Sequence, residues 1–152
     1  MLEKLIEDGD FASLMQKNIK DMISHFFEKE QNFGILCKIE DVYFEPVLPD
    51  EINTEFRALT LFFLAGYTFE TAHIVNDTLV FEAGFGSDNI GSLVNVPLLS
   101  ILQIIIDETP VLINLANYKK SKVIENRVNK KGIENSMDSF LSNPENSKFL
   151  KK

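Results

Sequence analysis

Apolar residues near the start of the chain recur at spacings of three and four. They are Phe11, Leu14, Met15, Ile19, Met22, Ile23, Phe26 and Phe27. This spacing places them on one stripe of a helix, and Asp8 or Asp10 can cap the first turn by accepting free backbone N–H groups. The pattern predicts an amphipathic helix over residues 10–31. Its three aromatic residues fit packing on the protein's own core, and they also fit the seam of a homodimer.

The next segments have the alternation typical of β-strands. Apolar side chains occupy every second position at Ile35, Cys37 and Ile39. A second short strand is expected at residues 42–44, and Pro46 and Pro49, which lack backbone donors, indicate a sheet edge or loop. Residues 57–64 are rich in apolar and aromatic side chains. They predict a buried strand, with a helix as the alternative, because periodicity does not decide a short apolar run.

A hairpin is expected in the middle of the chain. Asn76 and Asp77 tolerate the left-handed backbone of a tight turn, so residues 71–75 and 78–85 are predicted to pair. A loop rich in small and polar residues follows, made of Gly84, Gly86, Ser87, Asp88, Asn89 and Gly91. The chain then returns to a strand over residues 93–96.

Pro97 is well suited to start a helix, because its missing N–H costs nothing at a first helical position. The residues after it supply an apolar face, namely Leu98, Leu99, Ile101, Leu102, Ile104 and Ile105. We therefore expect a second helix that ends near Asp107, followed by a last strand over residues 111–115.

These elements predict an α+β protein of one domain. An N-terminal helix precedes a small, strongly bent antiparallel sheet or barrel, with one further short helix. The chain has 152 residues, which suits one hydrophobic core. We expect the domain to cover residues 1–117. Residues 118–152, rich in Lys, Asn, Ser and Glu, are expected to form a basic, partly mobile tail.

The net charge and the lengths of the apolar runs disfavour two kinds of partner, nucleic acids and membranes. Residues 1–118 hold 6 Lys and Arg against 19 Asp and Glu, a net charge of −13, whereas residues 119–152 carry +5. An acidic body disfavours nucleic-acid binding. The longest apolar runs, residues 58–67 and 98–106, are shorter than the ~20 residues of a membrane span. The acidic N-terminus does not resemble a secretory signal, and a single cysteine favours the reducing cytoplasm.

Few residues are suited to catalysis or metal binding. The chain has one cysteine, Cys37, and two histidines, His25 and His73. A structural zinc site needs more such ligands at close spacing. The segment from Gly84 to Gly86 lacks the lysine and hydroxyl residue of a phosphate loop. We therefore expect no metal, no cofactor and no enzymatic activity. An enzyme that uses Cys37 or His73 is the least favoured alternative.

Residues 61–108 resemble the substrate-binding domain of the stringent starvation protein B family. The residues that carry the resemblance are Asn76, Asp77, Leu79, Phe81, Ala83, Phe85 and Gly86, followed by Val94, Val96, Pro97 and Leu98. Members of this family are adaptors that hand tagged proteins to the ClpXP protease. Gly84 replaces the family's usual arginine, and Ser87 replaces the second glycine of that motif. The resemblance therefore does not carry over the specificity for a particular tag.

The resemblance implies a small barrel similar to that of Sm proteins, with a groove that holds an extended peptide. It places Leu64, Ala65, Gly66, Phe81, Ala83, Phe85 and Gly86 in the peptide site. It also implies a Clp-type unfoldase as a partner. The docking end would be formed by Phe149, Leu150, Lys151 and Lys152.

Two functions from different classes follow. The first is a peptide-binding adaptor, which requires a groove beside Ala83. The second is a structural or assembly protein that docks on a larger complex through helix 10–31 and the tail. A groove filled by Phe81 or Tyr67 would favour this second function. A hydrogen bond between Cys37 and a histidine would instead favour an enzyme.

Overall fold

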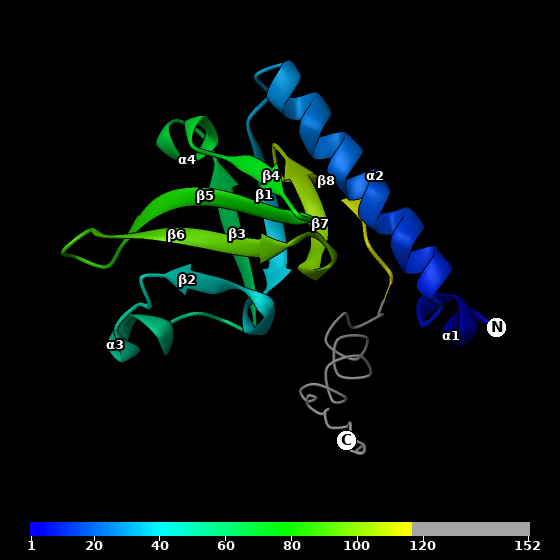
Figure 1. Ribbon diagram of the computed structural model, residues 1–152, viewed down its shortest axis with the longest axis horizontal. Coiled ribbons are helices and arrows are strands. Elements are labelled where there is room, and N and C mark those ends of the chain that lie inside the picture. Colours follow the sequence, from blue (N-terminus) through cyan, green and yellow to red (C-terminus); the bar gives the residue numbers. More distant parts are fainter. Residues whose placement is uncertain (117–152) are drawn as a thin grey trace, which may run out of the picture. The chain divides into compact units, whose positions relative to one another are not determined.

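The computed structural model describes residues 1–116, which contain helices and two antiparallel sheets (Figure 1). The helical elements are α1 (Leu2–Ile6), α2 (Gly9–Glu28), η1 (Ile39–Asp41), α3 (Asp50–Asn53), α4 (Tyr67–Glu70) and η2 (Leu98–Ser100). The strands are β1 (Phe33–Lys38), β2 (Tyr43–Glu45), β3 (Leu59–Leu64), β4 (His73–Val75), β5 (Thr78–Phe85), β6 (Ile90–Pro97), β7 (Ile101–Ile106) and β8 (Thr109–Ile113). The predicted tail, residues 118–152, lies outside the described residues, and so does the docking end that begins at Phe149.

Each sheet has four strands. Sheet A has the order β3-β1-β7-β8, and sheet B has the order β2-β6-β5-β4. Phe62 of sheet A and Phe81 of sheet B pack ring against ring across the shared core, with centroids 5.7 Å apart. The predicted α+β class is confirmed. Within residues 1–116 the strands form two sheets and do not close into a barrel.

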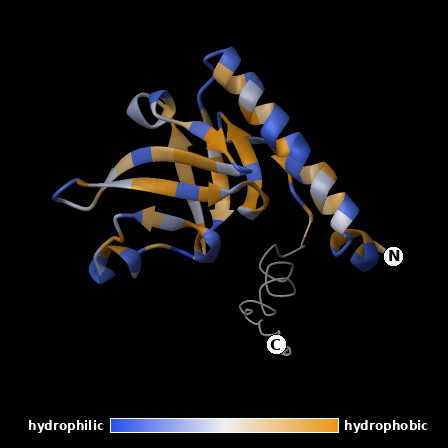
Figure 2. Cartoon of the chain, in the orientation of Figure 1, coloured by the Kyte–Doolittle hydropathy of each residue, from blue (hydrophilic) through white to orange (hydrophobic). Residues whose placement is uncertain are grey.

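The predicted N-terminal helix is confirmed as α2. Asp8 is its N-cap, and the Asp8 carboxylate accepts a hydrogen bond of 3.1 Å from the backbone N–H of Asp10. Figure 2 shows the alternation of hydrophobic and hydrophilic residues along this helix. Ile19 and Ile23 are fully buried in the core. The apolar stripe of α2 therefore packs on the protein's own sheets.

An aromatic cluster fixes the C-terminal end of α2. The ring of Phe26 lies 5.4 Å from that of Phe33 on β1, and the ring of Phe27 lies 5.7 Å from that of Phe69 on α4, measured between centroids. Two of the three aromatic residues of the predicted stripe thus contact residues of the same chain. A homodimer seam through helix 10–31 stays a prediction.

The hairpin predicted at residues 71–85 is confirmed as β4 and β5. Asn76 and Asp77 adopt positive φ angles of 51° and 59°, as the tight turn requires. The loop expected from Gly84 to Gly91 is shorter than predicted. Gly84 and Gly91 lie opposite each other within β5 and β6, and only residues 86–89 connect the two strands.

The helix predicted to start at Pro97 is wrong. A single 3₁₀ turn, η2, is followed by β7, which pairs with β1 on one side and β8 on the other. The β-branched side chains of Ile101, Ile104 and Ile105 favour an extended backbone. A strand in the interior of a sheet also reads as a continuous apolar run, which mimics a buried helix.

The predicted strand at residues 57–64 exists as β3, but only one of its faces is buried. β3 is an edge strand of sheet A. Phe62 and Leu64 point into the core, whereas the three residues that alternate with them are exposed, namely Leu59, Leu61 and Phe63. The last strand, β8, begins two residues before the predicted start at residue 111 and ends at Ile113.

Candidate functional site

A recess of about 900 Å³ opens beside the paired strands of sheet B. Strands β2, β5 and β6 and the short helix α4 contribute its lining, and Figure 1 shows where these elements lie in the fold. Small residues of β5 and β6 form one group, namely Ala83, Gly84, Gly91 and Ser92. Larger or polar residues surround them, namely Glu45, Pro46, Tyr67, Thr68, Glu82, Asn89 and Leu93.

Strand register brings these residues together from distant parts of the chain. Glu82 of β5 lies opposite Leu93 of β6, which in turn lies opposite Glu45 of β2. Residues directly opposite each other in an antiparallel pair share one face of the sheet. The two carboxylates therefore flank Leu93 on the same face.

The two glycines in this part of the sheet, Gly84 and Gly91, have different surroundings. No atom lies within 4 Å of the position that a Cβ would take at Gly91. At Gly84 a Cβ would lie only 1.9 Å from the Asn89 side-chain oxygen, so the Asn89 side chain occupies the space above that residue. Gly91 is thus the open point of the lining, and Gly84 accommodates Asn89.

Helix α4 is held beside the recess by threonine side chains. The Thr68 hydroxyl accepts a hydrogen bond of 2.9 Å from the backbone N–H of Ala65 and donates one of 2.8 Å to the carbonyl of Phe63. The Thr71 hydroxyl accepts a hydrogen bond of 2.9 Å from the backbone N–H of Glu82. These contacts join α4 to both sheets and fix Tyr67 at the rim.

The Tyr67 hydroxyl donates a hydrogen bond to the Glu82 carboxylate across this rim. The hydrogen bond and the negative charge of Glu82 raise the pKa of the Tyr67 hydroxyl. Tyr67 therefore stays a neutral donor at physiological pH. Among the described residues, the lining of the recess contains two carboxylates and no Lys, Arg or His, so the recess suits neutral or cationic groups better than anions.

Of the seven residues predicted for the peptide site, only Ala83 lines this recess. Leu64 and Phe81 are 0% and 1% exposed and belong to the core, because burying a large apolar side chain is more favourable than leaving it at a groove. Phe85 packs edge-on against Phe44, with ring centroids 5.5 Å apart. Ala65 is exposed in the turn before α4.

The two remaining predicted residues line other recesses. Gly66 lies beside Phe27 and Phe69 at a recess of about 630 Å³. Gly86 lies beside Ile52 at one of about 520 Å³. The structure thus places the predicted peptide-site residues in the core, at three separate recesses and, for Ala65, in an exposed turn.

Sequence reasoning missed the lining residues other than Ala83, among them Glu45, Tyr67, Glu82, Gly91 and Leu93. A signal for three of them was present. Two strands joined by a turn at residues 86–89 must pair Glu82 with Leu93 and Gly84 with Gly91. Glu45 and Tyr67 come from β2 and α4, whose positions depend on the tertiary structure. Local sequence carries no signal for them.

The residues considered for enzymatic chemistry do not come together. The Cys37 thiol is fully buried and donates a weak hydrogen bond of 3.6 Å to the carbonyl of Thr60. His25 and His73 are exposed. Within residues 1–116, no group of three or more His, Cys, Asp and Glu side chains is placed to hold a metal ion. No helix in this part of the chain is both long enough and apolar enough to cross a membrane.

The fold and the recess define an α+β protein with two antiparallel sheets and an acidic recess on one of them. In comparisons with known proteins, the chain matches no protein-family model, no curated protein and no solved structure.

Proposed function

We propose that this protein is a peptide-binding adaptor that holds extended polypeptide segments in the recess beside Gly91. The observation that carries the proposal is the recess of about 900 Å³ with small residues on two adjacent strands. A main chain can approach closely where side chains are small, and side chains of the bound segment can then enter the surrounding space. The resemblance to the stringent starvation protein B family supports the same function. We place it in the cytoplasm, where a single cysteine stays reduced.

The charge of the recess indicates what kind of segment it holds. Glu45 and Glu82 are both exposed at the lining, and their carboxylates flank Leu93. We expect segments that combine apolar side chains with Lys or Arg, since like charges are repelled from such a site.

Gly91→Gln is expected to weaken peptide binding at least about tenfold, because the longer side chain fills the open point of the recess. The fold should tolerate it, since nothing lies within 4 Å of the new Cβ and Gly91 does not have a positive φ. Random peptides are first selected on the full-length protein by phage display. Fluorescence anisotropy then measures the affinity of the selected peptides for the parent chain and the variant.

Val75→Gln is the matched control, because Val75 is exposed on β4 and does not line the recess. It should leave both affinity and melting temperature unchanged. Gly91 is a sharper test site than Ala83, since Ala83 also packs against the core. If the selected peptides bind Gly91→Gln as well as they bind the parent chain, the recess is not the peptide site.

Delivery to a Clp-type unfoldase is a separate part of the proposal. Removing residues 149–152 is expected to leave peptide binding unchanged and to slow delivery at least about tenfold, because these residues resemble a docking end. The measurement is the degradation rate of a reporter fused to a selected peptide, with a purified Clp-type unfoldase and protease. If the degradation rate of the reporter is the same with and without the full-length chain, the adaptor role is contradicted. The peptide-binding part of the proposal is not affected by that result.

The second candidate function is a structural or assembly protein. Exposed leucines on α1 and α2 favour it, namely Leu2, Leu5 and Leu14, which are 56%, 44% and 56% exposed. Such a protein would dock through this helical region and the tail. In that case phage display on the full-length chain should select no peptide that depends on Gly91.

A further inference from the structure

Within residues 1–116, one face of sheet A has no covering layer. Register places Phe63, Gly34 and Ile105 in one row across the sheet, and Leu61, Leu36, Gln103 and Ile113 in the next. Leu59 and Val111 lie on the same face by alternation. We call these nine residues the open face. Figure 2 shows how much of sheet A is hydrophobic.

The open face is large for a surface exposed to water. Phe63 is 64% exposed, and Leu59, Leu61, Val111 and Ile113 are 48%, 43%, 43% and 54% exposed. Their exposed parts amount to roughly 500 Å² of apolar area, near the upper end for the largest patch on a monomer. Together with a polar rim, this area approaches the approximately 800 Å² per partner of a standard interface.

Gly34 leaves room for the side chains of its neighbours on this face. A Cβ at Gly34 would lie 3.3 Å from side-chain carbons of both Leu61 and Phe63. These two side chains therefore lie over the glycine. The space above Gly34 is thus filled, which suits packing against another sheet face better than an inserted side chain.

The open face contains no carboxylate, although residues 1–118 hold 19 Asp and Glu. Lys38, opposite Leu59 in the register, is a charge at one margin, and Asp107 and Glu108, in the turn between β7 and β8, lie beyond the opposite margin. Gln103 is its polar member, and an amide both donates and accepts hydrogen bonds, so it can pair with a copy of itself. The nine residues themselves thus bring no acidic group into contact when two copies meet through this face.

We propose that the open face is the seam of a homodimer, in which sheet A of one copy packs on sheet A of a second. A twofold interface uses the same patch on both copies, and an apolar face with a self-pairing amide meets that requirement. Permanent homodimer interfaces are more apolar than transient ones, which must also be compatible with water. The composition of the open face is that of a permanent seam.

This seam differs from the one expected at helix 10–31. Phe26 and Phe27 of α2 contact Phe33 and Phe69 of the same chain, and Ile19 and Ile23 are fully buried. Phe63, the aromatic residue of the open face, has no such partner layer within residues 1–116. The inference goes beyond the proposed function and does not depend on it, since the recess lies on sheet B.

Light scattering with size-exclusion chromatography on the full chain tests the proposal across the micromolar range. The parent protein should elute with twice the chain mass of 17.3 kDa. Phe63→Lys places a charge of the same sign on both sides of the seam and should raise the dimer dissociation constant by about 100-fold or more. Leu14→Lys is the matched control, because Leu14 is exposed on α2 and lies outside the open face.

Leu61→Lys repeats the test at a second position of the open face. Phe63→Thr repeats it at the first position with an uncharged side chain that suits a strand. Circular dichroism shows which variants are folded, and only folded variants are compared. A parent chain that is monomeric across the micromolar range overturns the proposal. A dimer that survives every folded variant of the open face also overturns it, and so does a dimer that Leu14→Lys dissociates.

Discussion

Phe81→Ala is expected to lower the free energy of unfolding by about 3–5 kcal/mol, because it empties the space of a large buried ring. Phe81 is 1% exposed and packs edge-on against Phe62 of the other sheet. A loss of this size is a large part of the stability of an ordinary domain. It should lower the melting temperature by roughly 10–20 °C.

The same substitution decides between two roles for Phe81. A residue at a peptide groove would lose binding with little change in melting, whereas a core residue loses stability. Thermal melts and urea titrations followed by circular dichroism provide the measurement. Val75→Ala, on the exposed side of the neighbouring strand β4, is the control and should change stability by less than about 1 kcal/mol. A Phe81→Ala protein as stable as this control would contradict the packing described for the core.

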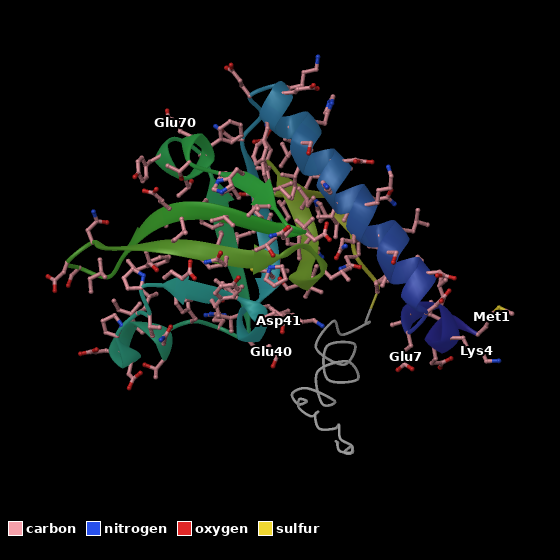
Figure 3. The ribbon with its side chains drawn as sticks, in the orientation of Figure 1. Met1, Lys4, Glu7, Glu40, Asp41 and Glu70 are labelled. Atoms are coloured by element: carbon pink, nitrogen blue, oxygen red, sulfur yellow. The ribbon has the colours of Figure 1, made fainter. Side chains whose placement is uncertain are left out.

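Alkaline pH is expected to destabilise the protein through Cys37. Burial, with a smaller contribution from the charge of Asp41, raises the pKa of the Cys37 thiol to about 12. Figure 3 shows Asp41 in the short helical turn that follows β1. The thiol of an unfolded chain ionises near pH 8.5. Above that pH the unfolded state releases a proton that the folded state keeps.

The sign of the effect follows from linkage, since stability falls with pH wherever the folded state binds more protons. The contribution of Cys37 is fully present below about pH 8.5 and is lost as the pH rises toward 12. Between pH 8 and pH 11 the loss should reach about 3 kcal/mol. Urea titrations at several pH values measure it.

Cys37→Ala provides the comparison for this prediction. The alanine variant has a cavity and starts from a lower stability, but it lacks the titrating thiol. All other ionisable groups are the same in both proteins, so their contributions cancel when the two pH profiles are subtracted. The difference in stability between the two proteins should shrink as the pH rises. Parallel profiles would show that the Cys37 thiol ionises as readily in the folded protein as in the unfolded chain.

Elements with a strong local signal were predictable from the sequence. The helix α2 has both a cap at Asp8 and a long apolar stripe. The hairpin of β4 and β5 has two turn residues that accept positive φ angles, Asn76 and Asp77. In both cases the residues that determine the structure are neighbours along the chain, so no tertiary contact is needed to recognise them.

Elements that depend on tertiary pairing were harder to predict. The run of isoleucines from Ile101 to Ile106 is apolar on both faces, and only its position between β1 and β8 makes it a strand. Likewise, β3 is equally apolar at its buried and its exposed positions. Sequence alone does not show which face of an apolar strand lacks a covering layer.

Of the candidate site, only a residue on strand β5 was predicted from the sequence. Ala83 was expected at the site and lines the recess. Leu64 and Phe81 were expected there on the basis of the resemblance, but the core requires their bulk. The carboxylates of Glu45 and Glu82 converge because β2 and β5 both pair with β6. This convergence depends on the sheet order, which no local pattern indicates.

The interleaved strand order has a consequence for how the chain folds during synthesis. β1, made early, has β7 as one of its two neighbours, and β2 has β6 as its partner. Sheet B cannot be completed before β6 has left the ribosome, and sheet A cannot be completed before β7 and β8 have left it. Until then β1 has only β3 as a neighbour, and α2 lacks its contacts with η2. Pairings between distant segments fold slowly and leave apolar surface exposed in the meantime. We therefore expect the nascent chain to rely on general chaperones until β7 is made, and fragments that end before Ile101 to aggregate.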